Sequence, residues 1–394
     1  MGATWTFHSA GQIIFGPGAV TQLGEVATRL GLRQIHLISD PILDRAGIVA
    51  QVREPLRQAG VEVLVDLGGE PEPTLAAALH CLERARAWQP DAIIGMGGGS
   101  NMDLAKLTAK CFTHGGQPGD YTGDDRLPGP ILPLICIPTT AGTGSEVSCA
   151  DVYTDPEQGI KLGSISNYLR PRVALIDPLL THSCPPRVTA DSGIDALVHA
   201  IEAYTAVDNA VFPLPPGLRS CYQGRHPMGV AMAREAITLA GKHLEQAVRH
   251  GTDAVAREGM ALAALYGGLA FSNVGVALVH ALEYAVASFV PVSHGAGNGL
   301  LVPHVMRFNK HGREDSMAEI GHYLGVAANA DAAIDAVAAL ANRIGIPQRL
   351  RDLGVTETML KPMAEKTVLM TRILRVNPRQ PSVDDLMGIL RAAF

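Results

Sequence analysis

The pattern of apolar residues changes near residue 180, and this change limits the folds open to the chain. Before that point, short apolar runs alternate with segments of helical spacing, which is typical of a parallel sheet with helices on both faces. The helices expected there are residues 20–30, 49–59, 75–88 and 102–111. After Asp177-Pro178, helical spacing recurs alone, in residues 188–204, 228–249, 253–271, 276–289 and 331–344.

We therefore predict an α/β domain at residues 1–182 and an all-helical domain at residues 183–394, with Pro185-Pro186 near the boundary. The length of 394 residues exceeds a single ordinary core, so two domains are expected. A hydrophobic content of 47% with 18% charged residues supports large buried cores.

A glycine-rich turn follows the apolar run at residues 92–96, which is typical of a buried strand. The turn leads into a helix expected to begin near Met102. A strand, a glycine turn and a helix N-terminus present free N–H groups to an anion, most often a phosphate. The alternative is a glycine turn that binds nothing. The residues of the turn are Gly97, Gly98, Gly99 and Ser100.

A second loop, dense in hydroxyl groups, follows the apolar run at residues 133–137. Hydroxyls beside exposed backbone amides suit a pyrophosphate or the polar edge of a nicotinamide. A polar surface loop would look similar, although such loops rarely follow a fully apolar strand. The hydroxyl-bearing residues are Thr139, Thr140, Thr143 and Ser145.

Asp40 lies at the end of a third predicted strand, just after its apolar run at residues 35–38. A carboxylate at the end of a strand in a nucleotide-binding sheet accepts hydrogen bonds from both ribose hydroxyls and repels a 2′-phosphate, which favours NAD over NADP. The alternative role is a helix N-cap before Pro41, and both roles are compatible.

One carboxylate and three imidazoles form a candidate metal site in the helical half. Asp195 and His199 are four residues apart in a predicted helix and share one face. His280 is expected on a second helix, with His294 in the loop after it. This ligand set suits a divalent metal such as Fe(II) or Zn(II). The alternative for the first pair is a hydrogen bond on a helix surface.

Taken together, these motifs resemble the iron-containing (group III) alcohol dehydrogenase family of the dehydroquinate synthase-like superfamily. The resemblance covers the full length and involves several motifs in the same order. They are FGPGAV (15–20), GGGSNMDLAK (97–106), IPTTAGTGSE (137–146), DSGIDALVHAIEAY (191–204) and SHGAGNGLLVPHVMRFN (293–309).

The resemblance implies a Rossmann-like nucleotide-binding domain and a metal, Fe(II) or alternatively Zn(II), held by Asp195, His199, His280 and His294. It also implies homodimers and a dinucleotide, NAD rather than NADP. Lys161, after a turn at residues 156–159, would lie near the nicotinamide ribose and phosphates. The expected cofactor residues are Asp40, Gly97, Gly98, Gly99, Ser100, Asp103, Thr139, Thr140, Thr143, Ser145 and Lys161.

Two features depart from the family pattern. Where alcohol-oxidising members often carry a proton-relaying histidine, this chain has Tyr284, whose ordinary pKa of about 10 suits relay poorly. The candidate catalytic residues are Tyr284, His280 and Asp195; the alternative for Tyr284 is a ring that only shapes the substrate pocket. The proline-rich segment 207–228 is unusually long, and its Arg219 and Arg225 are candidates for contact with a substrate carboxylate. Both features resemble the hydroxyacid–oxoacid transhydrogenase branch.

Composition favours a cytoplasmic enzyme. A net charge of −6 gives no reason to expect nucleic acid, and no uncharged apolar stretch reaches membrane-spanning length. The N-terminal residues show no signal-peptide pattern. The six cysteines include no CxxC pair, which is typical of free thiols in a reducing compartment.

Three functions remain open from the sequence. The first is NAD- and metal-dependent interconversion of a small alcohol and its aldehyde or ketone, by hydride transfer in an interdomain cleft. The second is a hydroxyacid–oxoacid transhydrogenase that retains NAD and needs none added. The third is a non-redox lyase like the dehydroquinate synthases. The predicted fourth ligand, Asp195, and the scarcity of basic residues disfavour the lyase.

Overall fold

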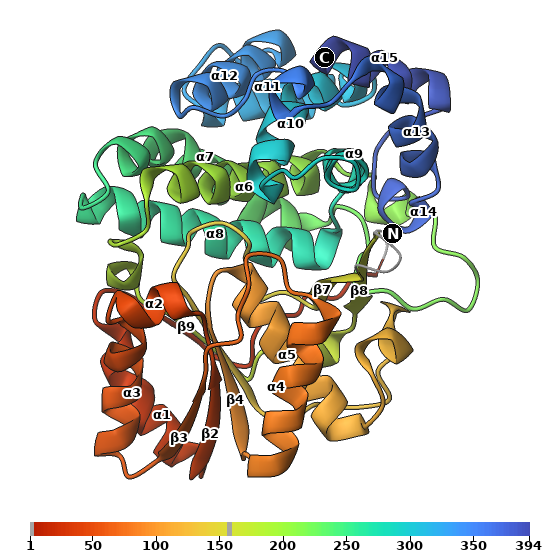
Figure 1. Cartoon of the computed structure of the whole chain (residues 1–394). Coiled ribbons are helices and arrows are strands. Elements are labelled where there is room, and N and C mark those ends of the chain that lie inside the picture. Colours follow the sequence, from red (N-terminus) through yellow and green to blue (C-terminus); the bar gives the residue numbers. More distant parts are fainter. Residues whose placement is uncertain (1–3, 156–159) are drawn as a thin grey trace.

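The structure is a computed structural model that describes residues 4–155 and 160–394 (Figure 1). Its first half is built on a sheet of six strands. They are β1 (Ile13–Phe15), β2 (Gln34–Ile38), β3 (Glu62–Asp66), β4 (Ala92–Gly97), β6 (Leu134–Pro138) and β9 (Val173–Ile176). Their order is β1-β9-β6-β4-β2-β3, and all neighbours are parallel. The predicted parallel sheet is confirmed.

Helices cover both faces of this sheet (Figure 1). They are α1 (Leu23–Arg29), α2 (Pro41–Arg45), α3 (Ile48–Gln58), α4 (Leu75–Trp88) and α5 (Gly99–His114). Side chains alternate along β4: Ala92, Ile94 and Met96 join the apolar core of α1 and α3, whereas Ile93 joins that of α4 and α5. Burial on both faces explains why β4 is apolar throughout.

Helix α5 begins at Gly99, so the prediction of a start near Met102 was wrong by one turn. Ser100 and Asn101 are poor helix formers, and their presence hides the first turn from a propensity argument. In that turn the backbone N–H groups have no partner within the helix, so polar residues are tolerated there. The end of α5 at which we predict an anion to bind is therefore the glycine turn itself.

The sequence pattern does not predict a second, smaller sheet. Its strands, in order, are β5 (Gly123–Asp124), β8 (Ile160–Ile165) and β7 (Ala150–Asp155), with β7 and β8 antiparallel. Burial alternates along β7, as expected for a strand with one covered face. The turn predicted at residues 156–159 lies outside the described residues. Lys161 lies on β8.

The remainder of the chain is helical, as predicted. The helices are α6 (Pro186–Thr205), α7 (Pro227–Arg249), α8 (Ala254–Val274), α9 (Leu278–Ala287), α10 (His294–Asn309), α11 (Glu314–Tyr323), α12 (Ala330–Arg343), α13 (Glu357–Val368), α14 (Thr371–Leu374) and α15 (Val383–Ala393). The five predicted segments correspond to α6, α7, α8, α9 and α12. The change of architecture falls between β9 and α6.

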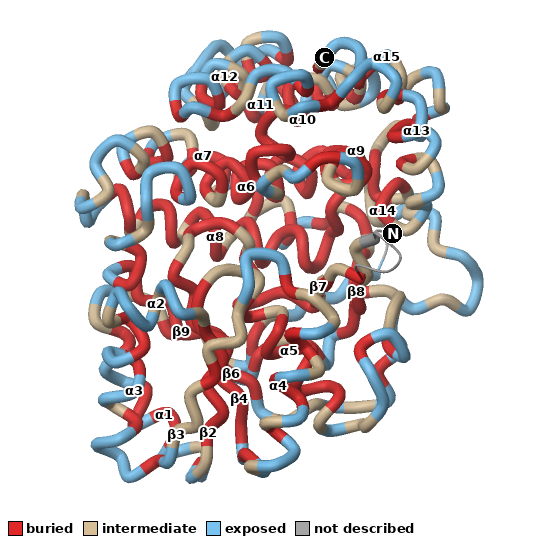
Figure 2. Tube along the Cα trace, in the orientation of Figure 1, coloured by how far each residue is buried: buried red, intermediate tan, exposed pale blue. Residues whose placement is uncertain are grey.

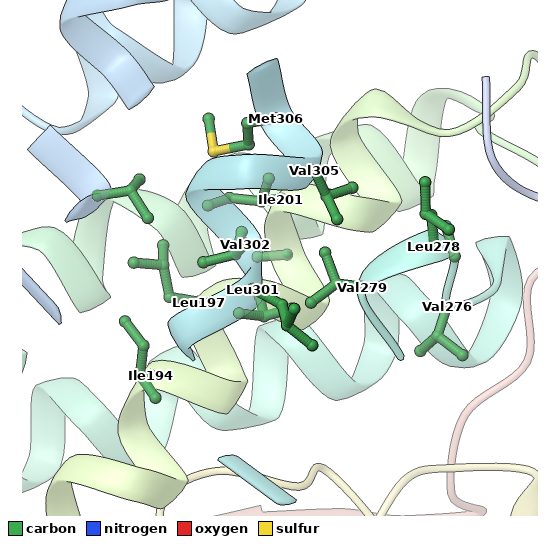
Figure 3. Close-up of a cluster of buried hydrophobic side chains, with 14 of the residues drawn as sticks. Ile194, Leu197, Ile201, Val276, Leu278, Val279, Leu301, Val302, Val305 and Met306 are labelled. Carbon is green, nitrogen blue, oxygen red and sulfur yellow. The ribbon is translucent and has the colours of Figure 1, made fainter. Parts of the chain in front are cut away.

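Helix α6 is the centre of this helical part. It packs against α7, α8 and α10, and Figure 2 shows it buried along most of its length. Ile194, Leu197 and Ile201 of α6 lie in one apolar cluster with Val302 and Met306 of α10 (Figure 3). Polar side chains on a helix buried this fully need partners inside the protein.

Among the described helices, no single one is long and apolar enough to cross a membrane. Helices α8 and α9 meet the length and composition criteria only as a pair, bent by 98°. All six cysteines are free thiols, as expected.

Candidate active site

Three helices bring together three of the four predicted metal ligands. Asp195 comes from α6, His280 from α9 and His294 from α10, and their ligand atoms lie within 4.8 Å of one another. Asp195 Oδ1 is 3.8 Å from Nε2 of both histidines. Atoms bound about 2.1 Å from one ion lie roughly 3–4 Å apart, so this spacing fits a divalent first-row metal.

His199, the fourth predicted ligand, lies beside this trio but outside the converging set. Its ring stacks between Phe271 and His280, with centroid distances of 4.2 and 4.8 Å. Its Nδ1 is 3.8 Å from Asp195 Oδ2 and is buried without a hydrogen-bond partner. Because buried imidazole nitrogens are normally paired, this free nitrogen beside a carboxylate is consistent with a metal ligand.

Two residues that the sequence analysis missed hold the trio in place. Asn298 Nδ2 donates to Asp195 Oδ1 at 2.8 Å and lies 3.3 and 3.2 Å from Nε2 of His280 and His294. Glu202 Oε2 accepts from His280 Nδ1 at 2.6 Å. Its carboxylate also accepts from the backbone N–H groups of residues 277 and 279. Donation from Nδ1 leaves Nε2 of His280 free as a ligand.

His294 is the first residue of α10, so its predicted position in a loop was wrong. The glycines after it suggested a loop, but they permit close packing. A Cβ on Gly295 would lie 1.8 Å from the carbonyl oxygen of Asp191, and one on Gly297 would lie 2.8 Å from Glu283 Cγ. Small residues let α10 approach α6 and α9 closely enough to complete the trio.

The protonation of two ring systems differs because their surroundings differ. Burial lowers the pKa of His199 to about 4, which keeps this ring neutral at pH 7. Burial also disfavours a charge on His294, but the carboxylates of Glu283 and Asp195 outweigh this effect and raise its pKa to about 9. A metal binding His294 therefore competes with a proton.

Tyr284 borders the trio, as its spacing of four residues from His280 predicts. Its ring stacks on His294 at 5.7 Å and meets the ring of His280 edge-on at 6.4 Å. Burial raises the pKa of the Tyr284 phenol well above its ordinary value. The hydroxyl accordingly stays protonated at neutral pH.

The predicted cofactor residues gather at one edge of the large sheet. Asp40 lies just after β2, the glycine turn follows β4 and the hydroxyl loop follows β6. After β2 the chain continues to β3 on one side, and after β4 it continues to β6 on the other side. The direction of the connections therefore changes between β2 and β4, and nucleotides bind at such a switch point. Gly97 has φ +140°, and a Cβ on Gly99 would lie 2.8 Å from Thr143 Cγ2. Glycine is therefore needed for the two loops to meet.

Asp40 is the N-cap of α2, so the capping alternative is confirmed. Its Oδ1 accepts from the N–H groups of Ile42 and Leu43 at 2.8 and 3.0 Å. Asn101 Nδ2 donates to Oδ2 at 2.8 Å. A carboxylate has about four lone-pair sites, so Oδ2 retains capacity for one more donor. The ribose role stays a prediction.

Several other predicted cofactor residues are engaged within the protein. Ser145 donates to Asp103 Oδ1 at 2.7 Å and accepts from the buried Lys106 at 2.8 Å. Burial raises the pKa of Asp103 to about 6. Ser100 donates to the carbonyl of Pro71. These contacts fix the two loops relative to each other. Of the remaining hydroxyl-loop threonines, Thr139 is buried and Thr140 is partly exposed.

Lys161 links the small sheet to the trio. Its Nζ forms an ion pair with Glu72 at 3.2 Å and lies 5.7 Å from the ring centre of Tyr284. The two arginines of segment 207–228 show no contact with the trio within the described residues. Arg225 pairs with Asp208 at 3.3 Å and Arg219 is exposed.

Comparison with known families decides the classification. The profile of the family described as iron-containing alcohol dehydrogenase matches residues 10–178. The profile described as the C-terminal part of the Fe-containing alcohol dehydrogenase family matches residues 221–394. The chain belongs to the iron-containing alcohol dehydrogenase family.

Individual relatives agree with this alcohol dehydrogenase assignment. The chain is 38% identical to long-chain-alcohol dehydrogenase 1 of Geobacillus thermodenitrificans (strain NG80-2), covering 98% of this chain and 97% of that one. It is 36% identical to 1,3-propanediol dehydrogenase of Citrobacter freundii, covering 96% of each. A crystal structure of 1,3-propanediol oxidoreductase has a TM-score of 0.92 at 35% identity and full coverage of both chains.

The protein is therefore an enzyme, an alcohol dehydrogenase of the iron type. The transhydrogenase and lyase alternatives are not favoured by these relatives. The parallel sheet followed by a helical part is also the architecture of the family.

Proposed function

We propose that this alcohol dehydrogenase uses a bound divalent metal and NAD to interconvert a small alcohol and its aldehyde or ketone by hydride transfer. The convergence of Asp195, His280 and His294 on three buried helices carries the proposal. The named relatives support long-chain alcohols and propanediol as first substrates to test.

In this proposal the metal is Fe(II), with Zn(II) as the alternative, and the trio together with His199 holds it. The metal, when bound, polarises the oxygen of the alcohol or carbonyl substrate. Asp195 contributes the one formal negative charge among the four ligands, so a divalent metal together with these ligands keeps a net positive charge. NAD binds at the switch point of the sheet, with its phosphates at the N-terminus of α5. Lys161 faces the nicotinamide half of the bound NAD.

The test is metal analysis of protein purified without oxygen, combined with an NADH-linked screen of alcohols and hydroxy acids. We expect bound metal and NADH formation from alcohols in proportion to added NAD. Full activity of metal-free protein, or hydride exchange between two substrates without added NAD, would contradict the proposal.

We further propose a cytoplasmic homodimer. The free thiols suit a reducing compartment, and the family resemblance implies dimers. Sedimentation analysis of the purified protein measures the assembly directly.

Asp40→Gly should relax the preference for NAD. Removing the carboxylate removes both a hydrogen bond to the ribose and the repulsion of a 2′-phosphate. We expect the NAD/NADP preference to fall by about 1–3 kcal/mol, the range of a charged hydrogen bond. The measurement is kcat/KM with each cofactor. Asp40→Asn can keep the Oδ1 acceptor that caps α2, but it replaces Oδ2 by an NH2 group and removes the charge, so it should also admit NADP. An unchanged ratio in both variants would leave Asp40 as a helix cap alone.

Tyr284→Phe should leave kcat nearly normal. The partly buried phenol stays protonated, so we expect its ring to shape the substrate pocket rather than to relay protons. A relay role predicts instead a loss of roughly 100-fold or more in kcat. Rates at neutral pH with one alcohol decide between these roles. Tyr284→His tests the family pattern, since a relaying histidine should raise alcohol oxidation at pH 7.

A further inference from the structure

Two glutamates stand behind the metal-site histidines, and the sequence places both in the same way. Residues 198–202 read VHAIE and residues 279–283 read VHALE. In each, a glutamate follows a histidine by three residues on one helix, so both side chains share a face. The first belongs to α6 and the second to α9.

Each glutamate supports a histidine on a different helix, later in the chain. Glu202 of α6 accepts from Nδ1 of His280 on α9, at 2.6 Å. Glu283 of α9 stands in the same relation to Nδ1 of His294 on α10, also at 2.6 Å. The two contacts repeat one arrangement across three neighbouring helices.

The surroundings of the two carboxylates differ. Glu202 also accepts two backbone N–H groups, so it helps to hold the start of α9. Glu283 is fully buried, and its Oε1 has no hydrogen-bond partner in the described parts of the chain. The positive charge of Lys161 favours the ionised form of Glu283, but the ion pair of Lys161 Nζ within the described residues is with Glu72, at 3.2 Å. Burying a carboxylate with one oxygen unsatisfied is unfavourable for the fold.

We propose that Glu283 is a positioning residue that fixes His294 as an Nε2 metal ligand. Donation of the Nδ1 proton to Glu283 Oε2 fixes the ring orientation and leaves the Nε2 lone pair facing Asp195. Asn298 Nδ2 lies 3.2 Å and Asp195 Oδ1 3.8 Å from this Nε2, so it is Nε2 and not Nδ1 that faces the converging ligand atoms. The inference rests on the proposed metal site and extends it to a residue that contacts neither metal nor substrate.

The test compares Co²⁺ binding by full-length wild-type, Glu283→Ala and Glu283→Gln proteins, stripped of metal and titrated without NAD or substrate. Alanine removes the acceptor, so we expect affinity to fall about 10–100-fold, the usual effect of losing such support. Glutamine keeps an oxygen that accepts from Nδ1, so its affinity and its cobalt absorption spectrum should stay near those of wild type.

The matched control is Glu319→Ala. Glu319 accepts from the Tyr204 hydroxyl at the same distance of 2.6 Å, on α11 and away from the trio, and its loss should leave Co²⁺ affinity unchanged. Thermal melting of the metal-free proteins distinguishes positioning from a purely structural role. A purely structural role predicts a lower Tm for Glu283→Ala with an unchanged affinity for Co²⁺. Equal affinity of wild type and Glu283→Ala, or equally weak binding by alanine and glutamine variants, overturns the positioning role. Failure of the wild type to bind Co²⁺ overturns the metal site itself.

Discussion

Replacing His280 with alanine should remove most of the bound metal and nearly all turnover while the fold survives. His280 Nε2 is one of the three converging ligand atoms, and three ligands in place of four leave an open, weakly held site. Even indirect support of a ligand is worth about 10–100-fold in metal affinity, so losing a ligand should cost at least roughly 100-fold. Metal content per chain and kcat with saturating NAD measure the two effects. The apolar cluster around α6 is large enough to keep the helices packed.

His199→Ala extends this test to the predicted ligand that lies outside the converging set. As a fourth ligand, His199 should show a loss comparable to that of His280. The control is His322→Ala on the exposed surface of α11, which should retain metal and rate. Wild-type metal occupancy and turnover in the His280 variant would contradict the assigned site.

The fold was predictable where local patterns agree with tertiary packing. The apolar run of β4 and the helical spacing of α4 are set by a few adjacent residues, and both were found at nearly the right bounds. Helix α10 was missed because Gly295, Gly297 and Pro303 are typical of loops. The two glycines are explained by the close packing of α10 on α6 and α9, a tertiary contact that a local sequence pattern does not reveal.

The site shows the same division. Asp195 and His199 could be paired from spacing alone, because four residues bring two side chains to one helix face. Asn298 and Glu202 could not be assigned, since their partners lie on other helices and depend on how these helices cross. One signal was available in retrospect: the repeated histidine–glutamate spacing of residues 199–202 and 280–283. This spacing identifies glutamates that hydrogen-bond to metal-site histidines only when α6, α9 and α10 are known to be neighbours.

Gly99→Val should abolish tight NAD binding. A Cβ at residue 99 would lie 2.8 Å from Thr143 Cγ2, closer than real side chains approach, so valine must push the glycine turn and the hydroxyl loop apart. The phosphates would then lose amide donors at the N-terminus of α5. Losing one or two charge-assisted hydrogen bonds, each worth about 1.5–3 kcal/mol, weakens binding at least roughly 10–100-fold. Fluorescence titration with NADH measures the affinity.

Gly388→Val is the matched control for this prediction, because Gly388 lies within α15 and a Cβ there meets nothing within 4 Å. It should bind NADH as the wild type does. Metal content provides a second check, since the trio lies on α6, α9 and α10 and should stay loaded when the glycine turn is altered. A Gly99 variant that keeps its metal but loses NADH therefore assigns the glycine turn to the cofactor. A variant that binds NADH with wild-type affinity would contradict phosphate binding at this turn. Close packing against Thr143 would then be the reason for glycine at residue 99.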